Sequence, residues 1–196
     1  MIAIEPSREP RIAPVVDMPE DVKDVVETGW QHDGNPLNLT LTLARNPRLL
    51  RRFSVFAGLF LMRSELPPRE QELLALRSAV RSGSEYLFGH HVHAARQAGM
   101  SANEIAETTQ LAEQSDDRDR LLTTVVDEMF TNGCVTDQTW DAIAEVLEPS
   151  QALEAVMAPG FYRMVANFVQ TIGVAAEPDL PGWPETNQSR STHQEP

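Results

Sequence analysis

The chain has 196 residues, of which 41% are hydrophobic and 23% are charged, and its formal net charge is −13 at neutral pH. This length and balance are ordinary for one soluble domain that buries a single core. They argue against binding to nucleic acid or to anionic membranes, because no cluster of Lys and Arg is present to neutralise phosphates.

The first residues contain Glu and Pro and no apolar stretch of signal-peptide length, so we expect a cytoplasmic protein. The longest apolar run, from Phe53 to Met62, is about half of the ~20 residues that a membrane span requires. Cys134 is the only cysteine, which excludes an internal disulfide and a cysteine-rich metal site. We expect Cys134, which follows a turn glycine, to be structural rather than reactive.

The two ends of the chain differ in composition from its middle. Residues 1–18 are rich in Pro and predict an irregular arm that lies along the body or along a neighbouring subunit. Residues 19–176 predict one all-α domain. Residues 177–196 carry Pro and polar residues with little to bury, which predicts a disordered tail unless Trp183 packs somewhere.

Helix-start and helix-stop signals recur through residues 19–176. Pro at first helical positions, small polar residues at N-caps and Gly after helix ends mark most boundaries. Ser101 and Glu104 form the clearest of these signals, a capping box. In chain order, the predicted helices cover residues 19–29, 47–63, 68–83, 84–99, 101–111 and 116–132, followed by one from Thr136, a short one from Ser150 and a final apolar one after Pro159-Gly160.

The segment from Leu37 to Leu43 departs from this pattern. Its apolar and polar residues alternate with a period of two, which locally favours a strand. A single strand without a partner nearby is unfavourable, so we interpret the segment as helical or extended. The predicted fold class is all-α.

The helix over residues 84–99 carries three histidines on two different faces. At about 100° per residue, Ser84, Leu87 and His91 share a stripe with small residues, whereas His90 and His93 lie on a neighbouring stripe. We expect the small-residue stripe to pack inward. His91 then needs a partner, because an unpaired buried polar group costs about 1–3 kcal/mol. Glu72, on the preceding helix, is the natural partner if it points inward.

His91 has two interpretations. It is either a core histidine whose hydrogen bonds are satisfied or a general acid–base group, since imidazole titrates near neutral pH. A metal site would have to use His90 and His93 with a third ligand from elsewhere, and no HExxH or Glu-x-x-His pair completes it. We therefore expect no metal in the site.

Four separated features resemble the carboxymuconolactone decarboxylase family, which includes the alkylhydroperoxidase-D-like (AhpD-like) proteins. That family has a glutamate, then Cys-x-x-Cys-x-x-x-His on a helix, and then an Ala-Gly turn before a further helix. In this chain Glu72 stands at the glutamate, Ser84 and Leu87 at the two cysteines, and His91 at the histidine. The sequence from Ala98 to Ile105 matches the turn, and the resemblance spans roughly residues 53–129.

The resemblance implies an all-α subunit that forms trimers or hexamers. The thiol–disulfide peroxidase chemistry of the AhpD-like members cannot operate without the two cysteines. The expected function is therefore a cofactor-independent acid–base enzyme, of the decarboxylase/lyase or isomerase type, that acts on a small organic acid or lactone. The alternative is a non-catalytic helical oligomer that binds a small ligand or a partner.

Within this interpretation each candidate residue has an expected role. His91 donates the proton to the substrate. Glu72 orients the imidazole of His91 or returns a proton to it. The candidate substrate-binding residues are Ser84, Tyr86, His90, Arg77 and Arg81, the two arginines as clamps for an anionic group. We expect a small-molecule substrate and no cofactor.

Overall fold

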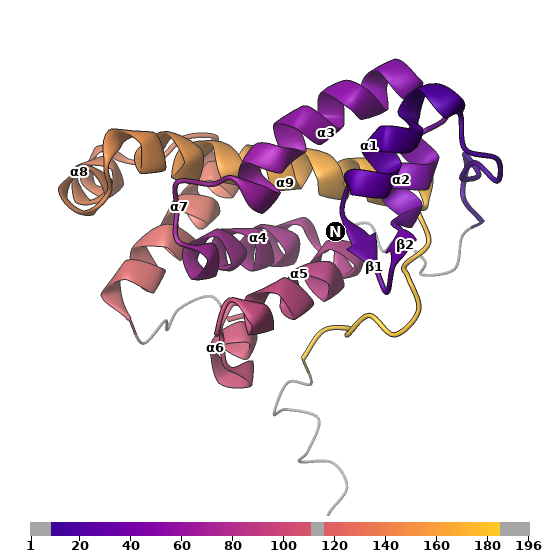
Figure 1. The fold of residues 1–196 in the computed structure, drawn as a ribbon. Coiled ribbons are helices and arrows are strands. Elements are labelled where there is room, and N and C mark those ends of the chain that lie inside the picture. The colour runs from indigo at the N-terminus through magenta and orange to yellow at the C-terminus, as the bar shows by residue number, and fades with distance from the viewer. Residues whose placement is uncertain (1–8, 111–115, 185–196) are drawn as a thin grey trace, which may run out of the picture.

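The computed structural model describes residues 9–110 and 116–184 and is built almost entirely of helices (Figure 1). The prediction of an all-α fold is confirmed. In chain order the elements are the 3-10 helix η1 (Glu20–Val22), α1 (Lys23–Thr28), strands β1 (Gln31–His32) and β2 (Asn35–Pro36), α2 (Asn38–Leu43), α3 (Pro47–Met62), α4 (Pro68–Ser82), α5 (Glu85–Gln97), α6 (Ala102–Glu107), α7 (Asp117–Asn132), α8 (Asp137–Val146) and α9 (Pro149–Ile172).

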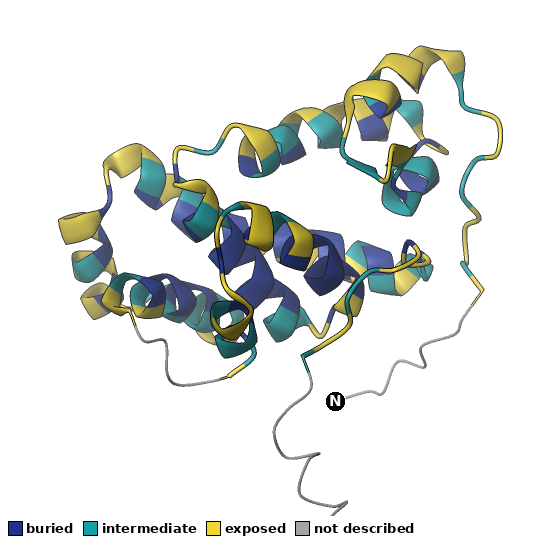
Figure 2. Ribbon diagram, turned by 60° about the horizontal axis from the view of Figure 1, so that its bottom comes forward, coloured by how far each residue is buried: buried dark blue, intermediate teal, exposed yellow. Residues whose placement is uncertain are grey.

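Helix α4 lies at the centre of the fold, packed against α5, α7 and α9. Its residues Leu73, Leu76 and Ala79 are completely buried, and buried positions gather where these helices meet (Figure 2). Helix α3 covers α9 through aromatic rings, with the centroids of Phe60 and Phe161 4.7 Å apart. The polar residues that α4 and α5 bring together are therefore enclosed by the core.

The helix boundaries follow local capping. Asn46 and Ser84 accept hydrogen bonds from backbone N–H groups in the first turns of α3 and α5. The predicted capping box of Ser101 and Glu104 is present at the start of α6. Gly83 and Gly133 end α4 and α7 in the left-handed conformation that favours glycine.

Residues 149–172 form one helix, α9, where two were predicted. Pro159 lies inside it and lacks the N–H that an interior helical position normally donates. Ala155, Ala158 and Phe161 on either side are buried in the core. Tertiary packing on both sides of Pro159 thus outweighs the local signal for a break.

The segment Leu37–Leu43 is helical, and a short hairpin that was not predicted precedes it. Residues Asn38–Leu43 form α2, in which the Thr42 side chain donates to the carbonyl of Asn38 at 2.7 Å. Strands β1 and β2 pair antiparallel around Asp33 and Gly34, which both have positive φ. An Asp-Gly pair is a typical sequence for such a two-residue turn.

The described part of the N-terminal arm has no helix or strand and lies along the body of the molecule. The N–H of Arg11 donates to the carbonyl of Ile172 at 2.7 Å, and that of Val15 donates to the carbonyl of Leu41 at 3.1 Å. Residues 1–8 lie outside the described part of the chain.

The C-terminal tail was predicted to be disordered from residue 177 unless Trp183 packs somewhere, and residues 177–184 meet that condition. Glu177 is buried, and the ring of Trp183 packs against Phe88 with centroids 4.7 Å apart. These side chains find partners on α5 that the local sequence does not reveal. Residues 185–196 lie outside the described part of the chain.

Among the described helices, none combines the length and the apolar character needed to cross a membrane.

Candidate functional site

Glu72 and His91 form a buried pair between α4 and α5. His91 Nδ1 lies 2.7 Å from Glu72 Oε2, and the two residues are 1% and 7% exposed. Because a carboxylate only accepts, Nδ1 carries the proton and donates it to Glu72. The second ring nitrogen, Nε2, is then left as the one that can meet a substrate.

The pair lines an inner cavity of about 430 Å³. Its walls come from α3, α5, α9 and the segment around the hairpin, and they are mostly apolar and aromatic. Trp30 meets the His91 ring edge-on with centroids 5.4 Å apart, and Tyr162 does so at 5.0 Å. This volume suits a small organic molecule, and the aromatic rings fix the plane of the imidazole.

A second carboxylate–histidine pair adjoins the same cavity, which His90 lines and Glu177 does not. His90 Nε2 lies 2.6 Å from Glu177 Oε2, and both residues are buried. The other oxygen of Glu177 accepts from the N–H of Asn38 at 2.6 Å and from the hydroxyl of Tyr86 at 3.3 Å. Burial raises the pKa of the Glu177 carboxyl, but the bonds from His90 and Asn38 outweigh it and the net pKa is lowered.

Two tyrosines of the cavity wall remain protonated. Burial raises the pKa of Tyr86, and the charge of Glu177 raises it further. Burial and the charge of Glu72 likewise raise the pKa of Tyr162. The Tyr162 hydroxyl has no hydrogen-bond partner within the described residues, although it is buried. Both phenols are therefore donors, and that of Tyr162 is unused.

Three of the predicted substrate-binding residues do not line the cavity. The Ser84 hydroxyl caps α5 by accepting from the N–H of Leu87 at 3.4 Å. Arg77 is 1% exposed and donates to Asp127 at 2.6 Å and 2.9 Å. Arg81 donates to Thr131 at 2.8 Å. Both arginines hold α4 against α7, so their predicted role as substrate clamps, and the predicted contact of Ser84, find no support in the structure.

The remaining predicted residues divide between the cavity and the surface. Tyr86, His90, His91 and Glu72 line the cavity together. His93 is exposed and lies 3.0 Å from the Gln97 amide, whereas His90 is buried against Glu177. These two histidines do not converge, and residues 9–110 and 116–184 hold no group of three side chains suited to a metal ion.

Sequence reasoning missed Trp30, Glu177 and Tyr162. No motif or spacing singled out Trp30 or Tyr162, and Glu177 lies in a Pro-rich segment without any periodic pattern. The one sequence feature that pointed to an ordered segment there was Trp183, a large aromatic residue in an otherwise polar tail.

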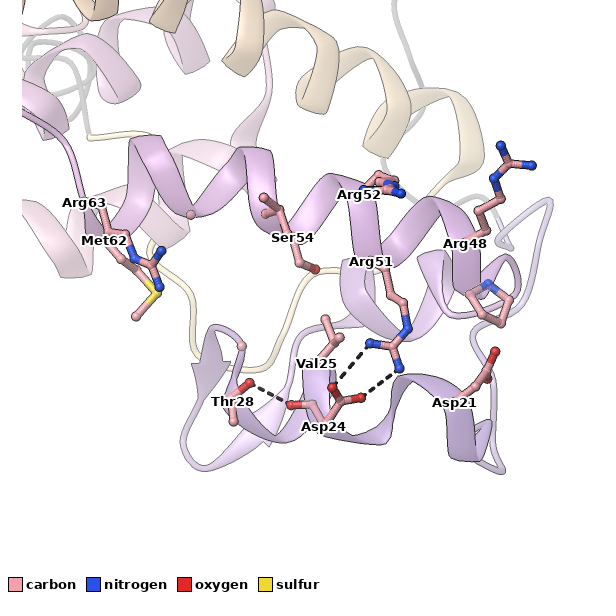
Figure 3. Close-up of a pocket in the computed structure, with 14 residues that line it drawn as sticks. Asp21, Asp24, Val25, Thr28, Arg48, Arg51, Arg52, Ser54, Met62 and Arg63 are labelled. Atoms are coloured by element: carbon pink, nitrogen blue, oxygen red, sulfur yellow. Dashed lines mark hydrogen bonds and ion pairs between the residues drawn. The ribbon is translucent and has the colours of Figure 1, made fainter. Parts of the chain in front are cut away.

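An open groove of about 830 Å³ lies between α1 and α3, beside the inner cavity (Figure 3). Arg51 forms an ion pair with Asp24 across it, at 3.0 Å. Four arginines line this groove, namely Arg48, Arg51, Arg52 and Arg63. Five residues line both hollows, which therefore adjoin, namely Val25, Gly29, Ser54, Gly58 and Met62.

These features define an all-helical domain whose cavity holds a buried carboxylate–histidine pair. Residues 47–123 match the carboxymuconolactone decarboxylase family. Over these residues the chain is similar to that family, and the whole domain shares the AhpD-like fold. No curated protein matches the chain by sequence.

Solved structures with a similar fold include two bacterial proteins described as peroxidase-related. One, from Silicibacter sp. TM1040, has a TM-score of 0.76 at 14% identity, over 91% of this chain and 97% of its own. The other, an alkylhydroperoxidase AhpD core protein from Ralstonia eutropha JMP134, has a TM-score of 0.76 at 17% identity, over 91% and 96%. At such identities the likeness concerns the fold alone.

A third similar structure is that of the debrominase Bmp8, a cysteine-to-alanine variant in complex with 2,3,4-tribromopyrrole. Its TM-score is 0.69 at 16% identity, over 85% of this chain and 91% of its own. One fold thus carries proteins with different described activities, and the chemistry of this chain has to be argued from its own residues.

Proposed function

We propose that the protein is a cofactor-independent acid–base enzyme that acts on a small organic acid or lactone, as a decarboxylase/lyase or an isomerase. The observation that carries this proposal is the Glu72–His91 pair, joined at 2.7 Å and lining a cavity of about 430 Å³. A histidine held by a carboxylate inside a small apolar cavity is a suitable group for moving protons at neutral pH.

The pairing gives each ring nitrogen a separate task. Glu72 accepts from Nδ1, which fixes the tautomer and stabilises the imidazolium when His91 is protonated. Nε2 then takes a proton from a substrate carbon, or gives one to it as carbon dioxide leaves. The phenol of Tyr162, whose proton has no acceptor within the described residues, is a donor in the same cavity and suits the negative charge that develops on an enolate oxygen.

A thiol peroxidase mechanism does not fit the residues of this site. Such a mechanism needs two sulfur atoms that form and break a disulfide. Ser84 and Leu87 stand at the two positions where the family carries cysteine. Cys134, the only cysteine of the sequence, is exposed between α7 and α8 and does not line the cavity.

The polarity of the two adjoining hollows favours one orientation of a carboxylated substrate. The described lining of the inner cavity includes no Lys or Arg, whereas that of the outer groove has four arginines against two aspartates, one of which pairs with Arg51. A carboxylate is therefore better accommodated toward the groove, with the reacting carbon beside His91. An uncharged lactone can lie wholly inside.

The test is proton exchange with two probes of the same carbon skeleton, α-angelica lactone and its open-chain counterpart levulinate. Each is incubated with the protein in heavy water, and deuterium incorporation and isomerisation are followed by NMR. We expect His91→Ala and Glu72→Gln each to lower the wild-type rate by about 100-fold or more. His93→Ala is the matched control, because it removes an exposed imidazole from the same helix.

Two outcomes would count against the proposal. Equal rates in the wild type and in both cavity variants would remove Glu72 and His91 from the chemistry. Saturable binding of either probe without any exchange would favour the alternative, a non-catalytic protein that binds a small ligand. Circular dichroism of each variant separates a lost activity from a lost fold.

A further inference from the structure

We infer that Glu177 makes His90 a second proton-transfer group, so that two carboxylate-paired imidazoles act on one substrate. This inference rests on the proposed function and extends it to the isomerase type of reaction. It starts from the second buried pair, His90 Nε2 to Glu177 Oε2 at 2.6 Å. His90 lines the same cavity as the first pair, whereas Glu177 holds the imidazole without lining the cavity itself.

The segment that carries Glu177, residues 175–184, is closely fitted to α5 and to the hairpin. A Cβ atom at Gly89 would lie 2.8 Å from the carbonyl oxygen of Pro181, so only glycine permits this approach. His32 Nε2 donates to the carbonyl of Pro178 at 3.1 Å. The end of the chain runs from α9 past the hairpin toward α5 (Figure 1). Glu177 is therefore held in place from both sides.

Glu177 divides its two oxygens between two tasks. Oε1 accepts from the N–H of Asn38 and ties the segment to α2. Oε2 accepts from His90 Nε2, which leaves Nδ1 as the free nitrogen of that ring. A tether alone would need only the first contact. The second one holds an imidazole with a carboxylate, as Glu72 holds His91.

The two imidazoles share their surroundings. Trp30 meets both rings edge-on, with centroid distances of 6.1 Å to His90 and 5.4 Å to His91. The groups that face His90 are the carboxylate of Glu177, the phenol of Tyr86 at a ring distance of 4.7 Å and the ring of His32 at 5.9 Å. Because both histidines line one cavity of about 430 Å³, a single small molecule is able to contact both.

Two such groups suit the transfer of a proton between two atoms of an uncharged enol lactone. One imidazole, neutral, takes a proton from the carbon beside the lactone carbonyl. The other, protonated, delivers a proton to the far carbon of the resulting dienolate. The substrate loses one C–H bond and gains another, no electrons leave it, and the imidazoles return to their starting state by exchanging one proton through water.

The test follows the isomerisation of α-angelica lactone by NMR in Glu177→Gln and in two matched controls. Glutamine keeps an oxygen for the Asn38 N–H but removes the charge beside His90. Asp179→Asn removes a charge from an exposed position of the same segment, and Trp183→Ala loosens the segment without touching the pair. We expect kcat to fall about 100-fold in Glu177→Gln with KM unchanged, and the controls to retain most of the activity.

The outcomes separate this inference from the proposed function. An unchanged kcat in Glu177→Gln beside an inactive His91→Ala overturns the second pair alone. An equal loss in Trp183→Ala reduces Glu177 to a tether and also overturns it. If the wild type leaves the lactone unchanged, the proposed action on lactones fails and this inference fails with it.

Discussion

Two adjacent imidazoles, His90 and His91, differ in the carboxylate that each one meets across the helix surface. His91 reaches back to Glu72 on the neighbouring helix, whereas His90 meets Glu177 from the C-terminal segment. Neighbouring residues on a helix point about 100° apart, so they meet different elements. Both rings nevertheless line one cavity, because the cavity extends over the part of the α5 surface from which both side chains project.

Access to the cavity can be tested at Gly58, which lines both the outer groove and the inner cavity. A Cβ atom at Gly58 meets nothing within 4 Å, and glycine inside a helix costs about 0.5–1 kcal/mol relative to alanine. We expect Gly58→Ala and Gly58→Leu both to raise the free energy of unfolding in urea. Gly58→Leu should also slow turnover of the lactone, because its side chain narrows the passage.

Gly58→Ala is the control for that experiment, since a single methyl group leaves the passage open. Equal turnover in the alanine and leucine variants would show that substrate reaches His91 by another route.

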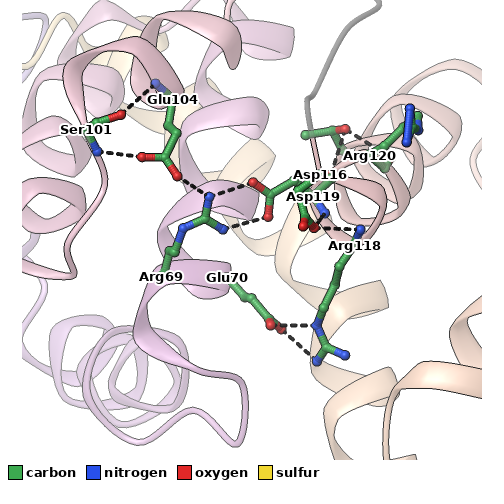
Figure 4. Close-up of polar contacts among 9 residues, drawn as sticks. Arg69, Glu70, Ser101, Glu104, Asp116, Arg118, Asp119 and Arg120 are labelled. Carbon is green, nitrogen blue, oxygen red and sulfur yellow. Dashed lines mark hydrogen bonds and ion pairs between the residues drawn. The ribbon is translucent and has the colours of Figure 1, made fainter.

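Elements are joined by ion pairs at the end of the molecule away from the hairpin. Arg69 on α4 binds Asp119 on α7 at 2.6 Å and also Glu104 on α6, while Glu70 binds Arg118 at 2.6 Å (Figure 4). The short helix α6 has few residues to bury, so its capping box and this contact with Arg69 determine its position.

Glu104 makes this junction sensitive to acid. Hydrogen bonds from Ser101 and Arg69 lower the pKa of the Glu104 carboxyl from 4.5 to about 2. A lowered pKa means that the stabilisation is complete above pH 4.5 and is lost as the pH falls toward 2. Glu104→Gln should therefore reduce the free energy of unfolding by about 1 kcal/mol at neutral pH. Its difference from the wild type should shrink steadily below pH 4.5.

Urea denaturation at several pH values measures this difference. Glu107→Gln is the control, as Glu107 lies on the same helix and forms no ion pair within the described residues. A Glu104 effect that stays constant down to pH 2 would contradict the assignment of the ion pair.

The whole molecule exposes apolar side chains along α3 and α9. Leu153, Met157 and Met164 recur on one side of α9 and are 65%, 52% and 46% exposed. On α3, Val55 and Met62 are 75% and 73% exposed. So many large apolar side chains exposed on one chain are typical of a surface that another subunit covers. We propose that the protein is a homo-oligomer, a trimer or hexamer, as its family resemblance implies.

Light scattering after size-exclusion chromatography tests this proposal. We expect a mass that is a multiple of 21.8 kDa. Met157→Glu should lower it, because a charge in an apolar interface is unfavourable. Gln138→Glu, on the exposed side of α8, is the matched control and should leave the mass unchanged. A monomeric wild type would refute the expected assembly.

The sequence by itself determined the helices and one of the two pairs. Caps at Ser84 and Ser101 and terminating glycines act through neighbouring residues, so local patterns predicted most boundaries. The contact of Glu72 with His91 was also predicted, because their separation of 19 residues joins consecutive helices through one turn. Helical periodicity placed His91 on the inward stripe.

Only the tertiary structure decided what else reaches the cavity. Glu177 meets His90 across 87 residues of sequence, and no local signal encodes such a contact. For the same reason the sequence did not show that Arg77 and Arg81 bind Asp127 and Thr131 on α7 rather than a substrate. The continuity of α9 through Pro159 was likewise decided by burial on both sides. Local chemistry fixes where helices begin and end, whereas the packing of distant segments fixes which side chains meet.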